Sequence, residues 1–158
     1  MKTQVHIKIV GNICRGKTTT ALEMLASAMK RKNTSTYYIT DELTSAVIIN
    51  RLASMGAFND ASNLPVILAS DVYEYSGYAL DELMLYISNE CSDKHSYIVI
   101  DVETIPTTMF QEYINKIIDV LNDKEYTIVT TVSAHKKLLN DDDMKVVQSN
   151  KLPFMKKE

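Results

Sequence analysis

The pattern of hydrophobic and polar positions along the chain predicts an alternation of strands and helices. Five short runs rich in β-branched, aromatic and other apolar residues predict strands. These runs are Val5 to Val10, Thr36 to Thr40, Leu64 to Ser70, Ser96 to Val102 and Tyr126 to Val132. Between them, apolar residues recur at helical spacing, which predicts four helices. The helical positions fall in the ranges 21–29, 45–56, 80–91 and 110–121.

Strands that alternate with helices are typical of a parallel sheet covered by helices on both faces. We therefore expect a three-layer α/β/α domain with a mainly parallel, five-stranded sheet over residues 1–137. Residues 138–158 are expected to form a C-terminal extension or tail. Two interpretations of that segment remain open, namely one more short strand around Val146 and Val147 or a loose tail.

Composition and charge narrow the class of protein. Charged residues make up 23% of the chain and the formal net charge is -3, so nothing indicates a globally basic coat for nucleic acid. No apolar stretch approaches the roughly 20 residues that a membrane helix needs. The two cysteines, Cys14 and Cys91, show no ligand spacing. We expect a cytoplasmic protein that does not associate with membranes.

The stretch "GNICRGKT", residues 11–18, carries the most specific signal in the chain. It fits the phosphate-binding pattern G-x-x-x-x-G-K-[ST] and lies between a predicted strand and a predicted helix, which is the context this pattern requires. Glycines let successive backbone N–H groups converge on an anion, and a helix N-terminus adds further donors. The expected nucleotide-binding residues are Gly11, Asn12, Ile13, Cys14, Arg15, Gly16, Lys17, Thr18 and Thr19.

Acidic residues at the ends of two other predicted strands complete a candidate site. Lys17 would reach the β- and γ-phosphates, while the Thr18 hydroxyl and Asp101 would hold Mg²⁺. Asp101 ends a buried strand, where ligands bind in open parallel sheets. Glu103 is a weaker candidate on the same face. Asp41 and Glu42 also follow a strand, where acids either position water for hydrolysis or merely complement a helix dipole.

The order of these pieces resembles the RecA-like ATPase core. The segments that carry the likeness are "GNICRGKTTTALEML", "TYYITDELTSAVIINRLASMG", "LPVILAS", "LDELMLYISNECSDKHSYIVIDV" and "YTIVTTVSAHKK". The resemblance is closest to the ATPase domains of DnaB-type replicative helicases and their KaiC and RadA relatives. It covers roughly residues 4 to 137 and implies a P-loop NTPase fold.

The resemblance also implies roles for single residues. It makes Glu42 the catalytic base, with Lys17 and Asp101 as the other catalytic groups. It implies a polar sensor at the end of the fifth strand and a basic finger that acts on the nucleotide of a neighbouring subunit. The candidates for the sensor are Thr131, Ser133 and His135, and those for the finger are Lys136 and Lys137.

The function expected from this resemblance is Mg²⁺-dependent ATP hydrolysis by a minimal helicase-like domain, in DNA metabolism or as an oligomeric motor. ATP and Mg²⁺ are the expected cofactors. The expected partners are further copies of the chain or another ATPase subunit, and single-stranded DNA. Two alternatives stay open, a nucleotide-dependent regulatory or loading module with slow or no turnover, and a small-molecule kinase. The kinase is disfavoured because the chain has only three arginines, Arg15, Arg31 and Arg51.

Overall fold

The computed structural model describes residues 3–11, 16–58, 64–72, 76–89, 94–103, 107–133 and 144–149. Within these ranges, strands and helices alternate along most of the chain. The strands are β1 (Gln4–Gly11), β2 (Thr34–Thr40), β3 (Val66–Leu68), β4 (His95–Asp101), β5 (Tyr126–Ser133) and β6 (Met144–Ser149). The helices are α1 (Lys17–Met29), α2 (Ser45–Ser54), α3 (Ser76–Asn89) and α4 (Thr107–Val120).

The strands form one sheet in the order β3-β2-β4-β5-β1-β6. The first five strands of this order run parallel, and β6 pairs with β1 in the antiparallel direction. The prediction of an α/β fold with a mainly parallel sheet is therefore confirmed. The five expected strands are present, and of the two interpretations left open for the segment around Val146 and Val147, the short strand is the correct one, because this segment pairs with β1 as β6.

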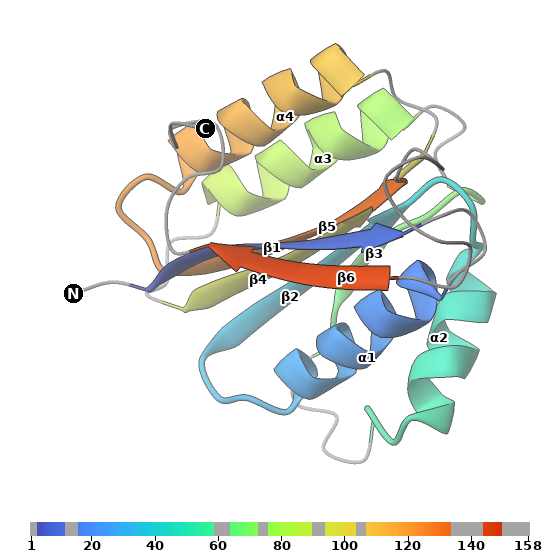
Figure 1. Cartoon of the computed structure of the whole chain (residues 1–158). Helices are drawn as coiled ribbons and strands as arrows, with labels where there is room; N and C mark the ends of the chain where they lie inside the picture. The colour runs from blue at the N-terminus through green and yellow to red at the C-terminus, as the bar shows by residue number, and fades with distance from the viewer. Residues whose placement is uncertain are drawn as a thin grey trace.

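Helices cover both faces of the sheet, with α1 and α2 on one side and α3 and α4 on the other (Figure 1). Alternation of side chains along β1 puts Val5, Ile7 and Ile9 in the core that also holds Leu22 and Leu25 of α1. A second core fills the opposite face. It contains Ile98 and Ile100 of β4, Ile128 of β5, Leu80 and Leu83 of α3, and Ile114 and Ile117 of α4. This is the expected three-layer arrangement.

Gly56 terminates helix α2. Gly56 has φ +74°, a conformation that glycine adopts at little cost. Its N–H donates to the Ala53 carbonyl, and the Ala57 N–H donates to the Leu52 carbonyl, each over 3.0 Å. This pair of bonds satisfies carbonyls that the last helical turn would otherwise leave without partners.

The third strand is shorter than its apolar run predicts. The prediction covered Leu64 to Ser70, whereas β3 spans only Val66–Leu68 and, among the described strands, pairs only with β2. Leu64 is 62% exposed, so its apolar side chain does not mark a buried strand position. Ser70 instead donates its N–H and its hydroxyl to the Leu43 carbonyl, over 3.1 and 2.8 Å, which fixes the loop that follows β2.

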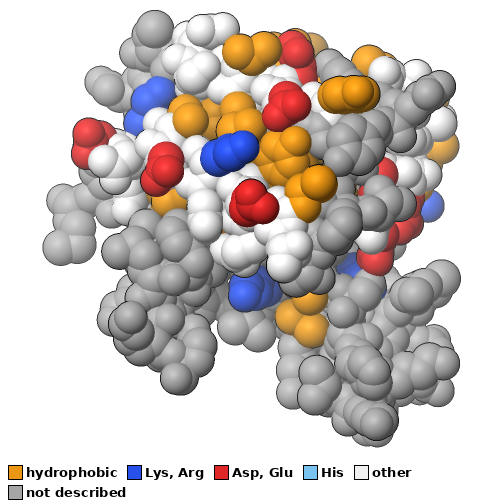
Figure 2. All heavy atoms as spheres, turned by 90° about the horizontal axis from the view of Figure 1, so that it is seen from above, with side chains coloured by type: hydrophobic (Ala, Val, Ile, Leu, Met, Phe, Trp, Pro, Cys, Tyr) orange, Lys and Arg blue, Asp and Glu red, His pale blue; other side chains and the backbone are white. Residues whose placement is uncertain are grey.

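The face formed by α3 and α4 carries hydrophobic side chains interspersed with charged ones (Figure 2). Tyr78, Leu85 and Tyr86 of α3 are 65%, 58% and 44% exposed. No helix in the described ranges is both long and apolar enough to cross a membrane.

Candidate functional site

The strand register assembles the candidate site at one edge of the sheet. Thr40, at the end of β2, pairs with Asp101 at the end of β4, and Gly11 of β1 pairs with Ser133 of β5. Because parallel strands all end at the same edge, the ends of β1, β2 and β4 meet there. The structure thus brings Gly11, the start of α1 and the acidic residues of the sequence analysis together.

The glycine loop is described at its two ends. Gly11 closes β1, and Gly16 directly precedes α1, which begins at Lys17. Thr18 is half-buried and Thr19 is exposed on the first turn of α1. The predicted nucleotide contacts of residues 12–15 lie outside the described residues.

Gly16 is in the left-handed conformation, with φ +86°, and its carbonyl accepts the first helical bond from Thr20 N–H at 3.0 Å. Apart from Gly16 itself and the residues next to it in the chain, no described heavy atom lies within 4 Å of the position that a Cβ would take. A substitution at this position would therefore cost energy through the backbone conformation and not through a steric clash. The glycine of the pattern is needed for its backbone conformation, as the sequence analysis expected.

We expect Gly16→Ala to lower the free energy of unfolding by about 1–2 kcal/mol, the cost of the left-handed conformation for a residue with a Cβ. Urea denaturation measures this change. Gly56→Ala is a matched control with the same kind of strain, because Gly56 has φ +74° at the far end of α2. If Gly16→Ala were as stable as the unchanged protein, the positive φ would not be required at the start of α1.

Lys17 is a buried cation, with only 5% of its surface exposed. Its Nζ donates to the Gly11 carbonyl at 3.0 Å and lies 3.9 Å from Glu103 Oε1. A buried ammonium is costly unless it is paired and hydrogen-bonded. The carbonyl and the carboxylate together hold the ammonium between the end of β1 and the loop after β4.

Asp101 is the most heavily bonded acid of the site, and it is 2% exposed. Its Oδ2 accepts from Thr18 Oγ1 at 2.7 Å and from the Tyr38 hydroxyl at 3.0 Å. Its Oδ1 accepts from Thr131 Oγ1 at 2.7 Å. Hydrogen bonds from hydroxyls to a carboxylate are short and strong, so this network fixes the orientation of the carboxyl group.

Strand alternation explains why these side chains meet. Val99 and Val129 belong to the core beneath α1, so Asp101 and Thr131, two residues further along their strands, point to the same face. Tyr38 of β2 also belongs to that core. Because β4 lies between β2 and β5, Thr131 of β5 reaches Asp101 from one side while Tyr38 of β2 reaches it from the other.

The two acidic loops after β2 and β4 are joined by hydrogen bonds. The Glu103 backbone N–H donates to both carboxyl oxygens of Asp41, at 3.1 and 3.0 Å. The Glu42 N–H donates to Thr40 Oγ1 at 3.2 Å. Asp41 thus does more than complement a helix dipole, because it positions the loop that carries Glu103.

Glu42 lies near three other carboxylates. Its pKa is raised above the ordinary value for a glutamate, first because burial disfavours the charged carboxylate, and then because the Glu103, Asp101 and Asp41 carboxylates repel its charge. The Lys17 ammonium acts in the opposite direction. Burial and the neighbouring Asp101 carboxylate likewise raise the pKa of Tyr38, so its hydroxyl stays protonated and can donate to that carboxylate.

The oxygen atoms at the carboxyl ends of the strands could serve as ligands for Mg²⁺, a cation that also binds phosphate. Within the described ranges, no three His, Cys, Asp or Glu side chains form a group that would hold a metal ion by themselves. Mg²⁺ does not require such a cage, since it is bound through one or two protein oxygens together with waters and phosphates. The Thr18 hydroxyl and the Asp101 carboxylate, which are in direct contact at 2.7 Å, fit that requirement.

Of the sensor candidates, Thr131 is at the site, because its hydroxyl contacts Asp101. Ser133 ends β5, next to Gly11 in the sheet. The remaining sensor candidate, His135, and the finger candidates Lys136 and Lys137 lie outside the described residues.

The sequence analysis missed Tyr38. It treated the "TYYIT" run as a strand and assigned no role to its tyrosines. The available signal was the pattern itself, since a tyrosine two residues before the end of a buried strand places its hydroxyl near the carboxyl ends of the neighbouring strands. Which acid it meets depends on β2 and β4 being neighbours, and that follows only from the sheet order.

No protein-family model matches the chain, and no curated protein matches it significantly. The α/β fold and the contacts around Lys17 and Asp101 are the features that bear on function.

Proposed function

We propose that the chain is a P-loop NTPase that binds ATP with Mg²⁺ and hydrolyses it, with a RecA-like ATPase domain of the DnaB type. The observation that carries this proposal is the 2.7 Å contact between Thr18 of the G-x-x-x-x-G-K-[ST] stretch and Asp101 at the end of β4. A chance match to the pattern would not be expected to bring its threonine against a buried carboxylate on another strand.

Each group has a task in this reaction. The start of α1 offers backbone N–H groups to phosphate oxygens, and the Lys17 ammonium neutralises charge on the β- and γ-phosphates. Thr18 and Asp101 would hold Mg²⁺, which supplies charge neutralisation across the phosphates when bound. Tyr38 and Thr131 keep the Asp101 carboxylate in place.

Two glutamates, Glu42 and Glu103, are candidates for the catalytic base. The resemblance assigns the role to Glu42, whereas the structure brings Glu103 within 3.9 Å of the Lys17 ammonium. The Glu103 carboxylate faces the Lys17 ammonium, which leaves it less available to a water molecule. The raised pKa of Glu42 makes it the better proton acceptor, and we propose it as the base that orients and polarises water.

The test is Mg²⁺-dependent phosphate release from ATP by the purified chain. We expect Glu42→Gln to lower turnover about 10²- to 10⁴-fold while ATP binding persists, and Glu103→Gln to lower it much less. The acid limb of the pH profile should lie above the ordinary glutamate range, because Glu42 must lose its proton and its pKa is raised. The opposite ranking of the two variants would transfer the role to Glu103.

Turnover and assembly separate this proposal from its alternatives. A chain that binds ATP but releases no phosphate, with or without single-stranded DNA, would be the regulatory or loading module. Phosphate transfer to a small acceptor rather than to water would indicate the kinase. Mass determination with and without ATP tests the proposed assembly with further copies of the chain or another ATPase subunit.

A further inference from the structure

The loop that carries Glu42 is hydrogen-bonded to the segments on both of its sides. This Glu42 loop comprises residues 41–44, between the end of β2 and the start of α2. In the sheet, β2 lies between β3 and β4, so the segments that follow those two strands flank the loop. Each flanking segment contributes hydrogen bonds, and each contribution involves an aspartate.

On the β3 side, Asp71 fixes the start of α2. Its Oδ1 accepts from the Ser45 N–H and from the Ser45 hydroxyl, each over 2.9 Å. The Ser45 N–H, and then the hydroxyl, hold the pKa of the Asp71 carboxyl below its ordinary value. The preceding residue, Ser70, donates its N–H and its hydroxyl to the Leu43 carbonyl. The backbone is therefore fixed immediately after Glu42.

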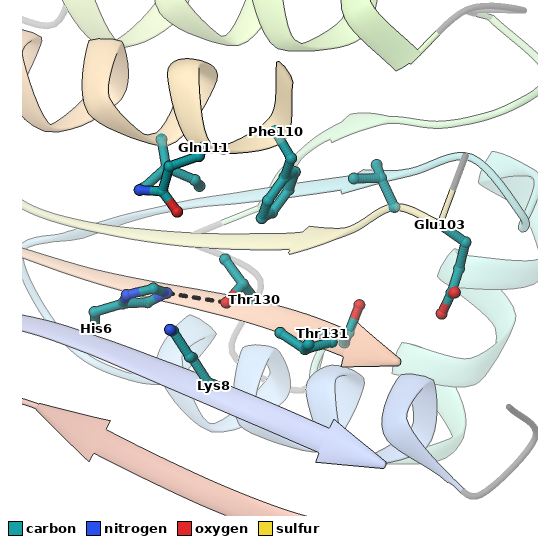
Figure 3. A pocket seen from close by; sticks show the side chains of 10 residues that line it. His6, Lys8, Glu103, Phe110, Gln111, Thr130 and Thr131 are labelled. Atoms are coloured by element: carbon teal, nitrogen blue, oxygen red, sulfur yellow. Dashed lines mark hydrogen bonds between the residues drawn. The ribbon is translucent and has the colours of Figure 1, made fainter. Parts of the chain in front are cut away.

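On the β4 side, Asp41 fixes the backbone immediately before Glu42. Both of its carboxyl oxygens accept from the Glu103 backbone N–H. Figure 3 shows the Glu103 side chain beyond the end of β4, where it points away from Phe110 and toward the face of the sheet that carries α1. On that face, Glu103 Oε1 lies 3.9 Å from Lys17 Nζ. Asp41 thus connects Glu42 to the segment that contacts the Lys17 ammonium.

Glu42 lies between these two sets of hydrogen bonds, with its carboxylate accessible. Its backbone N–H donates to Thr40 Oγ1 at 3.2 Å, while its side chain is exposed. The Asp101 carboxylate and the Lys17 ammonium are close enough to shift its pKa, in opposite directions. The backbone around Glu42 is therefore held in place, and its carboxylate lies near the groups proposed to bind Mg²⁺ and phosphate.

We propose that Asp41 and Asp71 are positioning residues for hydrolysis, which hold the Glu42 loop from its two sides and so fix where the Glu42 carboxylate meets the attacking water. The role of these aspartates rests on the proposed function, in which Glu42 is the base. A catalytic group must be held within about 0.5 Å of its productive position, and a displacement of about 1 Å can cost 10²-fold in rate. Both aspartates act through the backbone that carries Glu42.

The test measures phosphate release and ATP binding for Asp41→Ala and Asp71→Ala. We expect each variant to lower kcat about tenfold while the dissociation constant of ATP stays within about threefold, because the base is displaced and the phosphate contacts of α1 are not. Asp71 gives the cleaner result, because the charges that shift the Glu42 pKa are those of Glu103, Asp101, Asp41 and Lys17.

Two sets of control variants separate hydrogen bonding from charge and from general damage. Asp41→Asn and Asp71→Asn keep one oxygen that accepts a hydrogen bond, so their kcat should lie within about threefold of the original value. Glu125→Ala should leave kcat unchanged, because Glu125 is a half-exposed acid that lies near His95 at the opposite ends of the strands. Thermal unfolding shows that every variant is folded at the assay temperature.

A double-mutant cycle shows whether Asp41 acts through Glu42. When Glu42 is already replaced by glutamine, Asp41→Ala should lower the residual turnover by less than about twofold, because residues that act as a unit are not additive. A tenfold loss in both backgrounds would overturn the inference, as would an unchanged kcat in both alanine variants or equal losses for alanine and asparagine. Absence of phosphate release by the unchanged protein would overturn the proposed function, and the positioning role with it.

Discussion

Lys17→Met is expected to reduce ATP turnover by about 10²- to 10³-fold, the loss typical when one electrostatic contact to the developing charge is removed. The ammonium is 5% exposed and is held between the Gly11 carbonyl and the Glu103 carboxylate. Its removal also raises the pKa of Glu42 further, because Lys17 is the neighbour that lowers it. Phosphate release at saturating ATP and Mg²⁺ measures the effect.

The control for this variant is Lys30→Met, which removes an exposed ammonium at the opposite end of α1. Methionine preserves the length of the side chain, so both variants should keep their helix content by circular dichroism. Turnover above a tenth of the original rate in Lys17→Met would contradict the proposed phosphate site.

Asp101→Asn is expected to have two effects, the loss of Mg²⁺-dependent turnover and a loss of stability of about 1–3 kcal/mol. The carboxylate accepts three hydroxyl donors with its two oxygens, whereas an amide has one oxygen and a group that itself donates. At least one hydroxyl must therefore turn away or lose its acceptor. Urea denaturation and Mg²⁺ titration of turnover measure the two effects separately.

Tyr38→Phe separates stability from catalysis. It removes one donor to Asp101 from a fully buried position and leaves the Thr18 and Thr131 contacts in place. We expect a loss of about 1–2 kcal/mol, with turnover retained within a few-fold. If Asp101→Asn kept full turnover while both variants lost stability, the network around Asp101 would be structural only.

Much of the fold could be predicted from the sequence because the signals were local. Continuous apolar runs and helical spacing identified all four helices and the first five strands of the chain, and Asp101 was correctly placed at the end of a buried strand. The glycine pattern is also a local signal, because the positive φ of Gly16 requires glycine independently of which residues lie around it. The start of the third strand was predicted wrongly at Leu64, because this apolar residue is exposed and not buried.

The contacts between strands could not be read in this way. Thr131 and Tyr38 meet Asp101 only because β5 and β2 are the two neighbours of β4, and strand order is a property of the whole sheet.

The hydrogen bonds between Asp41 and the Glu103 amide have a consequence for motion. They tie the loop after β2 to the loop after β4, so neither loop can swing outward without breaking both contacts. The Glu103 amide proton can exchange with solvent only when its bonds to the Asp41 carboxylate break, so its exchange rate reports how often that happens. Any event that spreads these loops displaces the Glu103 carboxylate at once, and with it a contact of Lys17.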